Sequence, residues 1–257
     1  MSDLAIEVRG TGPVPLVLIH GWAMHGGIFA PLADLLESAF TMYLVDLPGH
    51  GNSRNSGIPL EPRACADAIA AATPPAVWLG WSLGGLVALT AALERHEHVL
   101  GLTMLCSTPK FVRDDTWPYG NDASMVRQLA ADLKTDYRAT LERFIALEAM
   151  GSADPRAEAR RLREETFARG EPDPRVLQEG IRLLETTDMR DRLPELVPAS
   201  LWMAGHRDRL VHPSAMKWSA NACGGDFNDI AHAGHAPFIG HADAMADALQ
   251  SFIGALA

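Results

Sequence analysis

One serine of this chain has the surroundings that acyl-transfer chemistry requires. Ser82 is the centre of Gly-Trp-Ser-Leu-Gly at residues 80–84, between an apolar run at 76–79 and a helical apolar run at 86–89. Small residues on both sides of a serine allow a strained turn from strand to helix that exposes the hydroxyl. The pattern predicts a nucleophilic serine at the end of a buried strand.

A nucleophilic serine also needs a base that removes its proton and a carboxylate that orients the base. Asp208 follows the expected strand at 200–204, and His235 begins His-Ala-Pro-Phe on a loop before the last expected helix. A serine, an acid and a histidine in this chain order, each placed after a strand, indicate a catalytic triad.

Other acids and histidines compete for these two roles, and we rank them lower. They lie at the exit of a helical segment, beside the last expected strand or on the loop after it: Asp188, Asp191, Asp226, Asp229, His232 and His241. Asp46 and His50 belong to Asp-Leu-Pro-Gly-His-Gly, which precedes the nucleophile in the chain. We interpret that segment as a structural turn.

Acyl transfer further requires N–H donors at the position where the oxyanion forms. The amide of Leu83, directly after the nucleophile, is one expected donor. His20-Gly21-Trp22 closes the expected strand at 14–19 and resembles an oxyanion turn, which would place the Trp22 amide beside the substrate carbonyl. We expect His20 itself to brace this loop.

The elements that must hold these residues alternate between strands and helices. Short β-branched or Leu-rich runs predict strands at 4–8, 14–19, 41–46, 76–80, 99–105, 200–204 and 226–230. Helical patterns lie near 28–38, 61–72, 83–95, 213–221 and 242–256. Such alternation is typical of an α/β fold with a mostly parallel, doubly wound sheet.

A helical segment interrupts this alternation. No convincing strand appears between Pro109 and Leu193, where helical patterns lie near 122–135, 137–150, 155–168 and 174–186. An insertion after the nucleophile unit should lie over the carboxyl ends of the strands, where ligands bind in open α/β sheets. We therefore expect a core at 1–109 and 194–257 and a helical lid at 110–193.

Composition excludes several classes of function. The net charge of −10 argues against a nucleic-acid partner, and no apolar run is long enough to span a membrane. No phosphate-binding glycine loop and no paired metal-ligand spacing occur, so we expect neither a cofactor nor a metal. The three scattered cysteines fit reduced thiols in a cytoplasmic protein.

The charge is unevenly distributed along the chain. Eleven basic and eleven acidic residues lie between Arg127 and Arg182, so this lid segment is neutral and the rest of the chain carries the entire excess of acid. Arg156, Arg160 and Arg163 share one helix face by their spacing. That face is either an ordinary solvated one, paired with Glu158, Glu164 and Glu165, or a patch that steers an acidic partner.

Together these segments resemble a known group of enzymes. The His-Gly-Trp, Asp-Leu-Pro-Gly-His-Gly, Gly-Trp-Ser-Leu-Gly-Gly and terminal His-Ala-Pro segments are similar to those of the α/β-hydrolase superfamily. Gly-Trp-Ser-Leu-Gly-Gly-Leu-Val at 80–87 and Glu-Arg-Phe at 142–144 more narrowly resemble the pimeloyl-[acyl-carrier protein] methyl ester esterases of biotin synthesis. The likeness covers nearly the whole chain.

The resemblance implies a serine carboxylesterase that hydrolyses the methyl ester of pimeloyl carried on acyl-carrier protein, and releases methanol. It implies a triad of Ser82, Asp208 and His235, with oxyanion donors at Trp22 and Leu83. It also implies carrier docking at Arg143, Arg156 and Arg160. Where the family has a further arginine this chain has Ala139, although Arg138 is adjacent.

Aromatic side chains are candidates for the acyl pocket, although each alone is more often part of a core. We expect Trp22, Trp81, Phe144, Phe111 and Trp117 to bind substrate in a mainly apolar tunnel. Three other functions stay open: a general short-chain carboxylesterase, a carbon–carbon bond hydrolase with the same triad, and a catalytically silent ligand-binding homologue.

Overall fold

A seven-stranded sheet forms the centre of the molecule. The computed structural model describes residues 4–256, so the expected core ends at 1–3 and 257 lie outside the described residues. The strands are β1 (Ile6–Arg9), β2 (Val14–Ile19), β3 (Phe40–Val45), β4 (Ala76–Trp81), β5 (Val99–Leu105), β6 (Ser200–Gly205) and β7 (Asp226–Ile230). Their spatial order is β1-β3-β2-β4-β5-β6-β7, and only the β1–β3 pair in this part of the chain is antiparallel.

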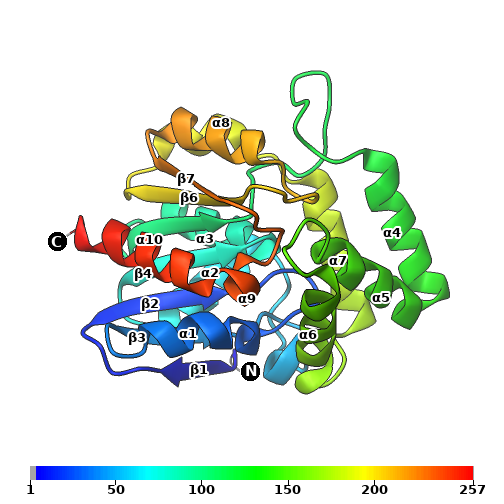
Figure 1. The fold of residues 1–257 in the computed structure, drawn as a ribbon, viewed down its shortest axis with the longest axis horizontal. Helices are drawn as coiled ribbons and strands as arrows, with labels where there is room; N and C mark the ends of the chain where they lie inside the picture. The colour runs from blue at the N-terminus through cyan, green and yellow to red at the C-terminus, as the bar shows by residue number, and fades with distance from the viewer. Residues whose placement is uncertain (1–3, 257) are drawn as a thin grey trace.

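Helices cover both faces of this sheet (Figure 1). One face carries α2 (Pro62–Ala72), α3 (Leu83–Glu94) and α8 (Pro213–Cys223). The other carries α1 (Ala30–Leu36), α9 (Pro237–Gly240) and α10 (Ala242–Gly254). Two separate clusters of buried apolar side chains fill the spaces between the sheet and these layers, as a doubly wound sheet requires.

Four further helices lie between β5 and β6 in the chain. They are α4 (Ala123–Thr135), α5 (Tyr137–Glu148), α6 (Pro155–Ala168) and α7 (Pro174–Thr186). Each begins after an aspartate whose carboxylate accepts a hydrogen bond from a backbone N–H of the first turn: Asp122, Asp136, Asp154 and Asp173. We call α4–α7 the cap helices; they lie together at one end of the sheet (Figure 1).

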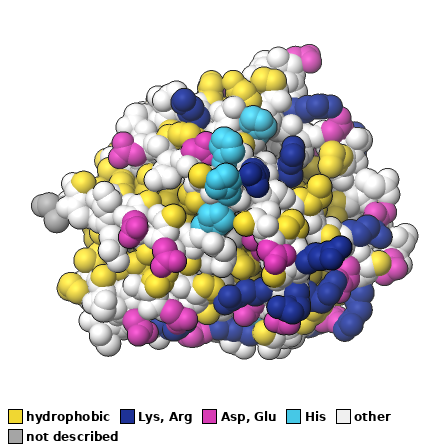
Figure 2. All heavy atoms as spheres, in the orientation of Figure 1, with side chains coloured by type: hydrophobic (Ala, Val, Ile, Leu, Met, Phe, Trp, Pro, Cys, Tyr) yellow, Lys and Arg dark blue, Asp and Glu magenta, His cyan; other side chains and the backbone are white. Residues whose placement is uncertain are grey.

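Charged side chains are distributed differently over the two parts. Figure 2 shows Lys and Arg gathered, with some Asp and Glu among them, on the side of the molecule where the cap helices lie. Among the helices within residues 4–256, none combines the length and the apolar character that crossing a bilayer needs.

The expected α/β architecture is confirmed, and most of its elements lie within two residues of the predicted positions. The region expected to be helical from residue 28 instead begins with a 3₁₀ turn at Gly26–Phe29, which leads into α1. The short helix α9, directly after His235, was not expected. Its four residues are too few to produce a helical pattern in the sequence.

Candidate active site

The turn from β4 into α3 presents Ser82 in a strained conformation. Its φ of 53° lies in the left-handed region, which a non-glycine residue rarely adopts. The flanking glycines are required by contact, because a Cβ on Gly80 would lie 2.4 Å from the carbonyl oxygen of Gly84. A Cβ on Gly84 would lie 2.4 Å from the carbonyl oxygen of Ile19. The sequence motif therefore forms the sharp turn that it predicts.

Three side chains from three loops meet at this turn. Nε2 of His235 lies 3.0 Å from Oγ of Ser82, and Nδ1 of His235 lies 2.8 Å from Oδ2 of Asp208. A carboxylate only accepts, so Nδ1–H donates to Asp208 and Nε2 is free to accept the serine proton. All three residues are buried. The three residues predicted as a triad are therefore joined in one hydrogen-bonded chain.

Neighbouring groups fix the acid and the base. Oδ1 of Asp208 accepts from the backbone N–H of Leu210 at 2.8 Å and of Val211 at 3.0 Å. The indole N–H of Trp81 donates to the carbonyl oxygen of His235 at 2.8 Å. Both oxygens of the Asp208 carboxylate thus have hydrogen-bond partners, and a hydrogen bond joins the backbone of His235 to the last residue of β4.

The lower-ranked candidates do not bond to Ser82, Asp208 or His235. His232 accepts a hydrogen bond from Arg207 at the surface, and Asp229 pairs with His206. His241 is the residue directly before α10, and Asp188 pairs with Lys110 and Arg190 outside the site. None of these side chains belongs to the chain of hydrogen bonds that contains Ser82.

The Asp-Leu-Pro-Gly-His-Gly segment serves the structure of a turn. The carboxylate of Asp46 accepts from the backbone N–H groups of Gly26 and Asn52, both between 2.7 and 2.8 Å, and pairs with Arg169. His50 is fully buried, and burial lowers its pKa to about 4. A neutral, enclosed imidazole and a fully occupied carboxylate fit the structural interpretation.

The loop after β2 lies directly against the serine. A Cβ on Gly21 would lie 3.0 Å from Cβ of Ser82, so this loop and the turn are in contact. Nε2 of His20 accepts from the N–H of Leu47 at 2.9 Å, which braces the loop as expected. Leu83 is the first residue of α3, and the N–H of a first helical residue has no acceptor within its own helix.

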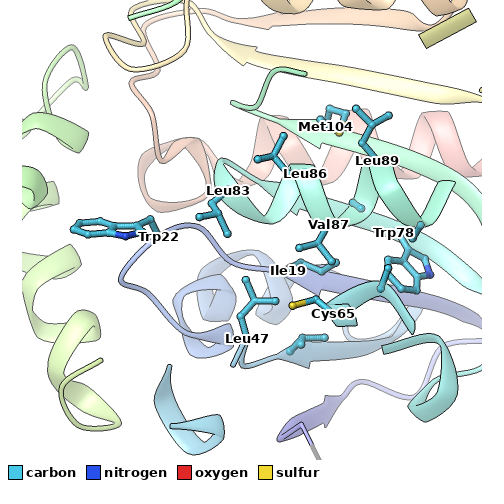
Figure 3. Packing of buried hydrophobic residues seen from close by; sticks show 14 of the residues in the cluster. Ile19, Trp22, Leu47, Cys65, Trp78, Leu83, Leu86, Val87, Leu89 and Met104 are labelled. Atoms are coloured by element: carbon cyan, nitrogen blue, oxygen red, sulfur yellow. The ribbon is translucent and has the colours of Figure 1, made fainter. Parts of the chain in front are cut away.

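The side chain of Trp22 is buried between the sheet and the cap helices. Figure 3 shows it pointing from the strand end toward the cap helices, while Ile19, Leu47 and Val87 pack near α3. Its indole N–H donates to the carbonyl oxygen of Leu177 in α7 at 2.8 Å. Its ring meets Phe144 of α5 edge-on, with 4.7 Å between ring centroids.

A mainly apolar cavity of about 520 Å³ opens above Ser82. The cap helices and the segments around residues 111 and 210 supply its apolar walls: Phe111, Met125, Val126, Leu129, Phe144, Leu147, Ile181, Leu184 and Leu210. Polar side chains lie along α4 and α5 at one side: Ser124, Gln128, Asp132 and Arg143, with Asn121 before α4. The predicted pocket residues Phe111 and Phe144 thus line the cavity.

The other three predicted pocket residues do not line this cavity. Trp81 is fully buried below the serine, where it meets the rings of His235 and Phe238. Trp117 packs against Trp218 of α8, away from the serine. Trp22 lies behind Phe144 and supports that wall. All three are nearly inaccessible, since a large aromatic ring finds more contact within the core than at a pocket surface.

The predicted docking arginines are exposed on α5 and α6. Arg143 pairs with Asp132 at 2.9 Å, and within the described residues Arg156 and Arg160 have no acidic partner. Arg163 pairs with Glu142 of α5 rather than with a glutamate of its own helix, and Glu158 is buried. The exposure of Arg156 and Arg160 also fits the alternative of a solvated helix face.

The described part of the chain contains one group of potential metal ligands, Cys106, Asp208 and His235, with ligand atoms within 4.8 Å of one another. The last two are already bonded to each other. Burial raises the pKa of the Cys106 thiol well above its usual range, and a protonated thiol is a poor ligand. The chemistry of these donors does not fit a metal centre.

Two features of the site escaped the sequence analysis. Oγ of Ser107 donates to the carbonyl oxygen of Ser82 at 2.6 Å and so holds the strained turn. Glu148 and Glu158, on two cap helices, are buried near Asp208. The spacing of Glu158 with Leu162 and Thr166, all on one buried helix face, was the available signal for the second feature.

The fold and the site together define a class. The chain belongs to the alpha/beta hydrolase fold family, whose model matches residues 14–242. Curated relatives narrow this to the family of pimeloyl-[acyl-carrier protein] methyl ester esterases. A relative of that name from Stenotrophomonas maltophilia is 55% identical over 252 residues, covering 98% of this chain and 96% of its own. Another from Xanthomonas campestris is 51% identical over 252 residues, covering 98% and 99%.

Solved structures agree on the fold. An esterase from Exiguobacterium antarcticum superposes with a TM-score of 0.87 at 23% identity, covering 98% of this chain and 95% of its own. An enol-lactonase from Burkholderia xenovorans reaches a TM-score of 0.84 at 17% identity, covering 98% and 96%. At such identities the likeness concerns the fold alone.

Proposed function

We propose that this esterase hydrolyses the methyl ester of pimeloyl carried on acyl-carrier protein, a step of biotin synthesis. The assignment of this substrate rests on the 55% identity, across 98% of the chain, to a relative named for that reaction. The hydrogen-bonded chain of Ser82, His235 and Asp208 at the base of an apolar cavity supports the chemistry.

The reaction proceeds through an acyl-enzyme in this proposal. Nε2 of His235 takes the proton of Ser82 while Oγ attacks the ester carbonyl, and Asp208 stabilises the imidazolium that forms. The C–O bond to methoxide then breaks, and the imidazolium gives its proton to the departing methanol. A water molecule, deprotonated by the same imidazole, attacks the acyl-enzyme. The bond between the acyl carbon and Oγ breaks, the imidazolium returns its proton to Oγ, and the carboxylic acid leaves and ionises in water.

The amides of Trp22 and Leu83 are the proposed oxyanion donors. Contact between the Gly21 backbone and Ser82, and the position of Leu83 at the first residue of α3, support this assignment. The apolar walls of the cavity suit the methylene chain of a medium-length acyl group. Its polar side, at Asp132 and Arg143, suits the more polar carrier-linked end.

We further propose that the chain divides into a core at 1–109 and 194–257 and a cap at 110–193. In this proposal the cap binds the acidic carrier through Arg143, Arg156 and Arg160. The exposure of these arginines, and the lack of acidic partners for two of them among residues 4–256, support that role. The three free cysteines support a reducing compartment such as the cytoplasm.

The test compares kcat/KM on the carrier-linked methyl ester with that on free monomethyl pimelate. We expect a strong preference for the carrier-linked ester and loss of both activities in Ser82→Ala. Equal rates on the two esters would reduce the function to a general short-chain carboxylesterase.

A second measurement separates an enzyme from a silent ligand-binding homologue. A fluorophosphonate probe should label the wild-type protein covalently and leave Ser82→Ala unlabelled. Absence of labelling in folded wild-type protein would overturn the proposed chemistry.

A further inference from the structure

We propose that Glu148 and Glu158 act as a buried carboxyl pair that positions the turn between α5 and α6 against the two loops carrying Asp208 and His235. The pair works while at least one of its members is neutral, so it makes the support of the triad dependent on pH. Both glutamates are positioning residues in this proposal, which rests on the proposed function only for the roles of the triad.

The turn between α5 and α6 touches the backbone of both triad loops. Gly151 has a φ of +88°, and a Cβ there would lie 2.2 Å from the carbonyl oxygen of Arg207, the neighbour of Asp208. A Cβ on Gly234, the neighbour of His235, would lie 3.1 Å from the carbonyl oxygen of Met150. Movement of this turn would therefore displace the backbone one residue away from Asp208 and one residue away from His235.

The two glutamates flank this turn and are buried. Glu148 is the last residue of α5 and is 1% exposed, and Glu158 in the first turn of α6 is 6% exposed. Within residues 4–256 neither forms an ion pair, and Oε2 of Glu148 and Oε1 of Glu158 have no hydrogen-bond partner. An unpaired carboxylate is strongly disfavoured in such a place, whereas a neutral carboxylic acid is tolerated.

The pKa values of both glutamates also favour their neutral forms. Burial, with the negative charges of Glu158 and Asp208 adding to it, raises the pKa of Glu148 well above its usual range. Burial raises the pKa of Glu158 to about 7. Burial, with the negative charges of Asp208 and Glu158 adding to it, raises the pKa of the Cys106 thiol well above its usual range, so this thiol adds no charge.

The charged groups that the structure describes around the two glutamates provide no cation that is paired with either of them. The groove between α6 and residues 239–241, in which Glu158 lies, carries both signs of charge: Asp154, Arg160, Arg161, Glu164, Glu165 and His241. From the triad loops, Arg207 is exposed and bonded to His232, so it offers no counter-charge to the pair. Ionisation of both glutamates would therefore place two charges beside Asp208 with no cation paired to either.

The sign of the effect on stability follows from the raised pKa values. The folded protein favours the neutral glutamates, so their contribution is fully present below the unfolded pKa of 4.5. It is lost progressively as the pH rises from there through about 7 for Glu158, and further for Glu148. Alkaline pH should therefore loosen the turn and slow the chemistry at Ser82.

Glutamine variants test this proposal, because an amide has nearly the shape of the neutral acid and does not ionise. The experiment measures Tm and the rate of fluorophosphonate labelling of Ser82 from pH 5.5 to 9 in wild type, Glu148→Gln/Glu158→Gln and Glu179→Gln. Glu179 is an exposed cap residue, so its variant is the matched control for loss of a negative charge.

We expect the double variant to exceed wild type in Tm at pH 8.5 by about 3 °C or more, and the difference to shrink toward pH 5.5. Its labelling rate should stay level at alkaline pH, where that of wild type and of Glu179→Gln declines. A double variant that follows the pH dependence of wild type, or that fails to fold at any pH, overturns the proposal. Neither readout needs the carrier-linked ester, so an error in the proposed substrate would leave this test intact.

Discussion

The sheet core and the cap are held together in different ways. In the core, apolar clusters enclose both faces of the sheet, and at Gly80 and Gly84 there is no room for even one methyl group. The cap adds apolar side chains such as Leu141 and Ile181 to one of these clusters, and on its outer surface exposed ion pairs such as Arg143–Asp132 and Arg138–Glu171 join neighbouring segments. Exposed pairs of this kind contribute little stability. The core can hold reacting atoms in place, while the cap can change its surface at small cost to the fold.

This contrast predicts that one set of mutations abolishes the reaction itself and a different set changes only the preference among substrates. Changes at the turn around Ser82 should abolish reaction with every ester. Changes on the outer surface of the cap should alter only the response to the carrier.

Replacing the nucleophile should have the largest effect on rate and almost none on the fold. We expect Ser82→Ala to lower kcat by roughly 10⁴-fold or more on carrier-linked and free esters alike. Its Tm should equal that of wild type or exceed it, because alanine removes a buried hydroxyl from a strained position. Residual turnover that still discriminates between the two esters would argue for a second nucleophile.

Adding one methyl group at the turn should damage the core. In Gly84→Ala the new Cβ would meet backbone oxygens of Ile19 and His20 at 2.4 and 2.5 Å, which cannot yield without moving β2. We expect a loss of about 3 kcal/mol or more in the free energy of unfolding, measured by urea denaturation. Gly57→Ala is the control, because nothing lies within 4 Å of a Cβ there. Equal stabilities of the two variants would contradict the close packing described for the core.

Removing a cap aromatic should weaken the binding of substrate. Phe144 lines the cavity and meets Trp22 edge-on, so Phe144→Ala opens the wall beside the acyl chain. We expect kcat/KM to fall by about tenfold or more, with most of the change in KM. Phe144→Leu should recover much of the loss. An unchanged KM on both esters would contradict the assignment of Phe144 to the substrate pocket.

Reversing charge on the cap should have the most selective effect. We expect Arg156→Glu/Arg160→Glu to lower kcat/KM on the carrier-linked ester by about tenfold, and to leave the free ester and Tm unchanged. The loss should shrink at high salt, where charges at the surface are screened. Lys217→Glu on α8 of the core is the control, since Lys217 is exposed but lies outside the cap. A similar loss in the control would point to net charge rather than to a docking surface.

Much of the fold and the chain of three side chains was predictable because local signals sufficed. The run at 14–19 and the helix at 174–186 have the predicted bounds, since strand patterns and an Asp-Pro helix start are encoded within a few residues. The order of Ser82, Asp208 and His235 after their strands was enough to bring them to one edge of the sheet.

The residues whose positions were not predicted are those placed by contacts between distant segments of the chain. Trp81 adjoins the nucleophile in sequence, but the sharp turn at Ser82 sends its ring under the site, against residues more than 150 positions later. One of the two alternatives for the arginine-rich helix placed Glu158 among surface ion pairs, because a glutamate in such a helix usually faces water. Only the docking of α6 on the core shows that this face is buried.

The bond between Trp22 and α7 has a consequence for the evolution of such enzymes. The same residue offers its backbone N–H to the proposed oxyanion site and its indole N–H to Leu177 of the cap. A Cβ on Gly180 would lie 2.7 Å from the indole ring, so the helix is shaped around that side chain. A cap transplanted from another hydrolase would need a matching carbonyl and a matching gap. The two parts of this lineage are therefore expected to diverge together rather than recombine freely.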